Sequence, residues 1–141
     1  MSTFQVIRFK YWDSVGTVTK LIHSWKPVDC RTEKEYENSL YAHLRTTLPG
    51  IVITPQFAFG RARTDLAVGN EVAIEIKKDL NDTSEFQRLL GQIHQFGDWR
   101  GYFIALLVGS TDPNLMDELV RQTRGIPGPF IDPKVVVVEK R

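Results

Sequence analysis

The chain has few of the features that mark secreted, membrane or disulfide-linked proteins. Its 141 residues include one cysteine, Cys30, which excludes a disulfide framework within the chain and fits a reducing compartment. No apolar run approaches membrane-spanning length, and no basic segment followed by an apolar one opens the chain. We therefore expect a cytoplasmic protein with no membrane partner.

An excess of charge of one sign is also missing. The chain has 18 Lys and Arg against 17 Asp and Glu, a formal net charge of +1. This balance excludes a histone-like protein that binds nucleic acid by charge alone. It does not exclude a nuclease, in which the negative charge of an acidic metal site offsets the positive charge of the residues that contact phosphates.

Two common kinds of site are missing as well. His23, His43 and His94 have no ligand spacing with one another, so zinc is not expected. The glycines do not form a phosphate-binding loop followed by a helix. Cys30 has no nearby base, and neither Ser39 nor Ser84 stands in a nucleophile motif.

The remaining composition is that of one globular domain over residues 1–141, with 42% hydrophobic and 25% charged residues. Apolar spacing predicts helices near residues 14–26, 32–48, 85–99 and 113–124. It predicts strands near 4–12, 51–59, 63–68, 72–78, 102–108 and 135–138. Pro55 indicates an edge strand or a bulge, and Ser84 is the expected N-cap of the third helix. This order predicts an α/β (α+β) fold, a central mixed sheet with helices on its faces.

The hairpin over residues 63–78 carries the most distinctive pattern. A two-residue turn would place Asp65 opposite Ile74, on the apolar face. A three-residue loop after Val68 pairs Val68 with Val72 and places Asp65 opposite Glu75. Only the second register keeps every charge off the core side, so we expect it. One face then carries Arg63, Asp65, Ala67, Ala73, Glu75 and Lys77.

Polar residues on the flanking helices extend this group. Glu37 and Glu33 lie on the same side of their helix as its buried leucines. Arg88 and Gln92 lie one turn apart at the edge of the next helix's apolar stripe, within reach of a neighbouring strand. Each has a simpler interpretation as a solvated or hydrogen-bonded structural residue.

The hairpin resembles that of the PD-(D/E)xK nuclease superfamily, which includes restriction endonucleases and Holliday-junction resolvases. Asp65 matches the first acid of the family, although Thr64 replaces the proline often found before it. Glu75, Ile76 and Lys77 match the Glu-x-Lys element.

The flanking helices add to the resemblance, which covers residues 33–109 in the order helix, three strands, helix, strand. Glu37 resembles the glutamate of the first helix, with Glu33 as the alternative. Gln92, followed by Phe96, resembles the glutamine motif of the next helix. The resemblance implies a restriction-endonuclease-like core, with residues 1–30 as an N-terminal extension and residues 110–141 as a C-terminal helix and strand.

The resemblance also implies a role for each matched residue. Asp65, Glu75 and the Ile76 carbonyl are expected to bind Mg²⁺, with Mn²⁺ as a possible substitute, and Glu37 to bind a second metal directly or through water. Lys77 is expected to orient or deprotonate the attacking water, or to stabilise the transition-state charge. Arg88 and Gln92 would position the scissile phosphate or hold the acids. The candidate contacts with the DNA backbone are Arg61, Arg63 and Lys78.

The expected function is therefore Mg²⁺-dependent hydrolysis of DNA, with RNA left open as a substrate. A resolvase-like homodimer could form through the aromatic and basic segment 4–12 or the strand 135–138. Two alternatives stand beside this function. One is a catalytically inactive nuclease fold that binds nucleic acid or mediates assembly. The other is a purely structural salt-bridge cluster on a sheet surface.

Overall fold

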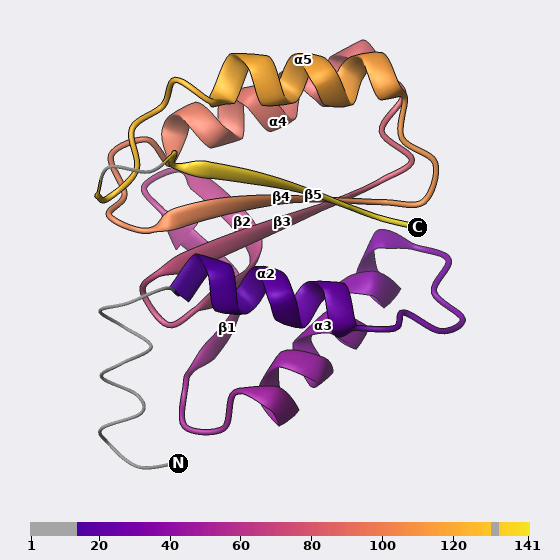
Figure 1. The fold of residues 1–141 in the computed structure, drawn as a ribbon, viewed down its shortest axis with the longest axis vertical. Coiled ribbons are helices and arrows are strands. Elements are labelled where there is room, and N and C mark those ends of the chain that lie inside the picture. Colours follow the sequence, from indigo (N-terminus) through magenta and orange to yellow (C-terminus); the bar gives the residue numbers. More distant parts are fainter. Residues whose placement is uncertain (1–13, 131–132) are drawn as a thin grey trace.

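The computed structural model describes residues 14–130 and 133–141, so the strand expected over residues 4–12 lies outside the described residues. These residues form an α+β fold with a five-stranded mixed sheet flanked by four helices (Figure 1). The helices are α2 Ser14–Ser24, α3 Glu33–Thr47, α4 Thr83–Gln95 and α5 Pro113–Thr123. The strands are β1 Ile53–Phe59, β2 Ala62–Val68, β3 Val72–Lys78, β4 Tyr102–Val108 and β5 Val135–Lys140.

The sheet separates two hydrophobic clusters. Helices α2 and α3 cover one face and α4 and α5 cover the other (Figure 1). The strand order is β1-β2-β3-β4-β5, antiparallel from β1 to β3 and parallel from β3 to β5. Every residue of β4 is buried. The continuous apolar run of this strand is thus explained by burial on both faces, as its sequence predicted.

The hairpin register is the one the charge pattern predicted. Val68 pairs with Val72, which leaves a three-residue loop, and Leu66 pairs with Ile74. Gly69 occupies the first loop position with φ 55°, a left-handed conformation that glycine adopts without steric cost. In this register Asp65 and Glu75 lie directly beyond the last pair of the ladder, Leu66 with Ile74.

The β1–β2 hairpin changes faces along its length, which the sequence did not predict. Ile53 and Leu66 pack in the α2–α3 cluster, whereas Phe57, Phe59 and Ala62 pack in the α4–α5 cluster. The hairpin therefore twists from one side of the sheet to the other. Because Ala62 faces α4, the neighbouring Arg63 points away from that cluster and is exposed. The expectation that Arg63 shares a face with Ala73 was wrong.

Strand β1 lies at an edge of the sheet, as Pro55 indicated. The register runs without an inserted residue from Pro55, paired with Leu66, to Phe57, paired with Thr64. Between them, Gln56 has φ 51° and lies level with Asp65. The strand is thus distorted by one left-handed residue and not by an extra one.

The helix ends follow local hydrogen bonding. The capping box of Thr32 and Glu35 forms as predicted. Helix α4 is capped by Asp82 and not by Ser84, because the Asp82 carboxylate accepts hydrogen bonds from the N–H groups of Ser84 and Glu85. It also ends at Gln95, earlier than expected. On α5, Val120 is 43% exposed, so its predicted inward position was wrong.

The corrected cap gives a first prediction. Asp82→Ala should lower the free energy of unfolding by about 1 kcal/mol, the usual cost of losing an N-cap carboxylate. Ser84→Ala should change it by less than about 0.5 kcal/mol, since Ser84 lies inside the helix and donates its hydroxyl to Asp82. Urea denaturation of both variants measures the difference, and an equal or larger loss in Ser84→Ala would contradict the assignment.

Candidate active site

Asp65 and Glu75 lie where β2 and β3 stop pairing. The ladder joins residues 66–68 to 72–74, and beyond it the two side chains bond to backbone instead. The N–H of Asp65 donates to Glu75 Oε1 at 3.1 Å, and the N–H of Ile76 donates to Asp65 Oδ2 at 2.8 Å. These reciprocal bonds hold the two carboxylates side by side. They also satisfy two N–H groups at the end of the ladder.

The environment disfavours charge on both acids. Burial raises the pKa of Glu75 to about 7, helped by the negative charge of Asp65 and opposed by Lys77 and Gln92. Burial is also the main cause that raises the pKa of Asp65, while the Ile76 N–H lowers it and Glu37 and Glu33 raise it further. The pair therefore forms a partly buried acidic centre with too little positive charge around it.

Lys77 places a positive charge beside Glu75. Its Nζ lies 3.3 Å from Glu75 Oε2, and its side chain is 19% exposed. Like Glu75, it projects from β3 towards the α4 side of the sheet, as strand alternation requires. The acids and the lysine that the sequence grouped are thus brought together.

The two helix acids occupy different positions. Glu37 is buried and accepts hydrogen bonds at Oε1 from Gln56 and Lys34. Glu33 is exposed and accepts from the N–H of Lys78 at 2.8 Å. Both raise the pKa of Asp65, and Glu37 contributes more. Helix α3 therefore presents two carboxylates, one turn apart, to the end of the hairpin.

The remaining predicted site residues differ in whether they contact the two acids. Gln92 joins the site, because its side chain donates to the Arg63 carbonyl and to the Glu75 carboxylate. Arg88 is exposed on α4. Hydrogen bonds from Ser84 lower the pKa of Asp82, and the charge of Arg88 lowers it further. Of the candidate backbone contacts, Arg61 and Arg63 are exposed at the far end of the β1–β2 hairpin, and Lys78 pairs with Asp79.

Gln56 belongs to the site, although no sequence pattern indicated it. Its Nε2 donates to Glu37 Oε1 at 3.0 Å across the space between β1 and α3. A glutamine on an edge strand after a proline has no pattern that indicates either a left-handed backbone or a buried carboxylate partner. Only the tertiary arrangement reveals the contact.

The acidic pair suits a divalent cation of the magnesium type. Its donors are carboxylate oxygens, which Mg²⁺ prefers, and Mg²⁺ commonly uses only one or two carboxylates and keeps several waters. Within residues 14–130 and 133–141, no group of three or more His, Cys, Asp and Glu side chains is arranged to hold a metal ion. A cation here would therefore rest mainly on Asp65 and Glu75, completed by backbone oxygen and water.

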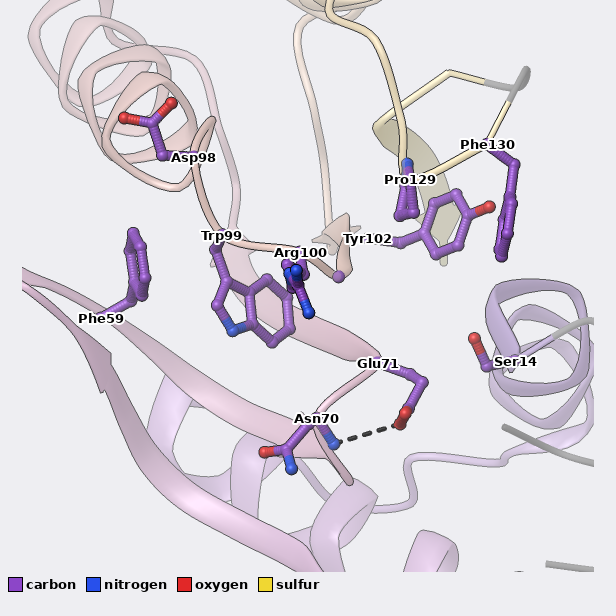
Figure 2. A pocket seen from close by; sticks show the side chains of 11 residues that line it. Ser14, Phe59, Asn70, Glu71, Asp98, Trp99, Arg100, Tyr102, Pro129 and Phe130 are labelled. Atoms are coloured by element: carbon purple, nitrogen blue, oxygen red, sulfur yellow. Dashed lines mark hydrogen bonds between the residues drawn. The ribbon is translucent and has the colours of Figure 1, made fainter. Parts of the chain in front are cut away.

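A separate hollow of about 550 Å³ lies at the other end of β3 (Figure 2). Its lining includes Glu71, Trp99, Arg100 and Tyr102, together with residues that adjoin the undescribed segments, Ser14 and Phe130. Neither Asp65 nor Glu75 lines it. The acidic centre and this hollow are distinct features of the surface.

Comparisons with protein-family models, with curated proteins and with solved structures found no match. In the part of the chain that the structure describes, no helix is long and apolar enough to cross a membrane.

The raised pKa values predict an unusual pH dependence of stability in metal-free protein. Between about pH 4.5 and 7 the unfolded chain releases the Glu75 proton while the folded protein keeps it. The free energy of unfolding should therefore fall as pH rises through this window, by up to the order of 3 kcal/mol from Glu75.

The pH effect can be assigned by substitution. Glu75→Gln should remove most of this fall, because the amide does not titrate. Asp117→Asn, at an exposed carboxylate of α5, should retain it. Denaturation from pH 4.5 to 8 in the presence of a chelator measures both, and parallel curves for wild type and Glu75→Gln would contradict the buried-acid description.

Proposed function

We propose that the protein is a metal-dependent nuclease that hydrolyses phosphodiester bonds in DNA. The observation that carries this proposal is the pairing of Asp65 with Glu75, two desolvated carboxylates locked together by backbone N–H groups with Lys77 beside them. Desolvated like charges lower stability unless a cation or a proton compensates them. Such a cost is typical of functional sites.

The arrangement of the elements supports the same proposal. Helix α3, strands β1 to β3, helix α4 and strand β4 follow one another in the order of a restriction-endonuclease-like core. The acids lie on β2 and β3, Glu37 on the preceding helix and Gln92 on the following one. We therefore propose that the fold belongs to the PD-(D/E)xK class.

Asp65 and Glu75 would hold Mg²⁺ or Mn²⁺ in this proposal, with the Ile76 carbonyl as a further oxygen ligand. Glu37 would contribute directly or through water, and we prefer it to Glu33 because Glu37 is buried. Bound Mg²⁺ would polarise the phosphate and favour deprotonation of a bound water. Binding would also release the proton that Glu75 holds below pH 7.

The chain's own side chains have separate tasks. Lys77 can orient the attacking water or stabilise negative charge at the phosphate, because its Nζ lies beside Glu75. Gln92 holds the Glu75 carboxylate in place through its amide. Arg61, Arg63, Lys78 and Arg88 are candidate phosphate contacts, and such contacts fix the position of DNA without reading its sequence.

A catalytically inactive domain is the second candidate function. The ion pair of Lys77 with Glu75 favours it, because that contact partly offsets the negative charge of the site without a metal. Such a domain would bind nucleic acid through its basic residues or mediate assembly. Its binding would weaken with salt and would not depend on a divalent cation.

Cleavage of a panel of plasmid, single-stranded and branched DNA, and of RNA, tests the proposal. Wild-type protein should cut DNA with Mg²⁺ or Mn²⁺ and not with a chelator. Asp65→Asn, Glu75→Gln and Lys77→Ala should each lower the rate by about 100-fold or more, since each removes a group proposed to act on the reacting atoms.

Matched substitutions of exposed residues control for charge. Lys20→Ala on α2 and Asp117→Asn on α5 remove one charge each far from the site in sequence, and should cut at the wild-type rate. Binding of DNA without cleavage, unchanged by metal, would favour the inactive domain. Equal cleavage by wild type and Glu75→Gln would refute the active-site assignment.

A further inference from the structure

Gln56 combines two unusual features at one position. Its backbone has φ 51°, a conformation that residues other than Gly, Asn and Asp rarely adopt. It lies in the middle of β1. The residues on both sides keep their pairing with β2, so the surrounding strand does not relax to remove the strain. Strained residues of this kind persist where their surroundings fix them, and they concentrate at functional sites.

The strained position coincides with the turning point of the β1–β2 hairpin. Before it, Ile53 packs on the α2–α3 side; after it, Phe57 packs on the α4–α5 side. The left-handed residue changes the direction in which the strand presents its side chains. As a result, Gln56 reaches towards α3 while the next residue, Phe57, packs against Phe96 and Trp99.

The amide of Gln56 ends on the buried helix acid. Glu37 is 5% exposed, and its Oε1 accepts from Gln56 Nε2 at 3.0 Å and from Lys34 Nζ at 3.3 Å. The Lys34 side chain is 64% exposed, so that ion pair is weakened by solvent. The Gln56 amide makes the shorter of these two contacts with the carboxylate.

We propose that Gln56 is a positioning residue, whose left-handed backbone directs its amide to Glu37 and so fixes that carboxylate towards Asp65. This inference rests on the proposed metal-dependent nuclease function. It adds a residue to the site that acts through Glu37 and does not itself touch the metal or the substrate. Partners of this kind set the orientation of metal ligands and commonly alter metal affinity or activity by 10- to 100-fold, roughly, when removed.

Gln56→Gly separates the backbone from the side chain. Glycine adopts φ 51° without strain, so metal-free Gln56→Gly should be at least as stable to urea as wild type. It lacks the amide, so it should bind Mn²⁺ about 10-fold more weakly and cut DNA about 10-fold more slowly. A structural role alone would instead lower stability and activity together.

Two further variants sharpen the test. Lys34→Ala removes the other partner of Glu37 Oε1 and should change Mn²⁺ affinity by less than about 2-fold, as expected for an exposed ion pair. In a Glu37→Gln background, Gln56→Gly should cause no additional loss of Mn²⁺ affinity, because the residue acts only through Glu37.

Three results would overturn the inference: wild-type Mn²⁺ affinity in Gln56→Gly, a full additional loss in the Glu37→Gln background, or a marked loss of metal-free stability. If wild type cuts DNA but Gln56→Gly matches it, only the positioning role fails. If wild type binds no Mn²⁺ and cuts nothing, the nuclease proposal fails and the role of Gln56 falls with it.

Discussion

The hydrogen bonds from the Asp65 N–H to Glu75 and from the Ile76 N–H to Asp65 are the constraint on which the rest of the site depends. Each carboxylate accepts a backbone N–H at the point where β2 and β3 separate. The bonds lower the cost of placing two acids together, but burial still raises both pKa values. The charge of Asp65 raises the pKa of Glu75 further, and the charges of Glu37 and Glu33 raise that of Asp65. The fold thus retains a local cost that a salt bridge with Lys77 only partly offsets, and a bound cation would remove it.

The sheet provides the rigidity that this constraint needs. Strand β3 passes between β2 and the fully buried β4, and clusters of side chains cover both of its faces. The site lies where the regular ladder gives way to the twist of the β1–β2 hairpin. Gln56 accommodates that twist with a left-handed backbone, at a cost of about 1–3 kcal/mol. Beyond it, Phe57 and Phe59 pack against Phe96.

The features predictable from sequence were those set by side-chain periodicity. The register followed because any other would bury the charges of the hairpin, and the mixed sheet followed from the apolar run of β4. The twist of the β1–β2 hairpin and the contacts of individual polar side chains were not predictable. The exposed position of Arg63 depends on the twist of the whole hairpin. The N-cap of α4 depends on which local N–H groups donate to the Asp82 carboxylate. The Gln56–Glu37 hydrogen bond joins residues that are 19 apart in the chain. Such contacts leave no periodic signal.

The measurement that tests the central claim most directly is the anomalous difference density of crystals soaked in Mn²⁺ at pH 8, above the pKa of Glu75. We predict a peak in contact with the carboxylates of both Asp65 and Glu75, with Lys77 displaced from its ion pair or retained beside the metal. Crystals that show no peak at these acids, with the Glu75–Lys77 pair intact, would contradict the account and leave a structural salt bridge in its place.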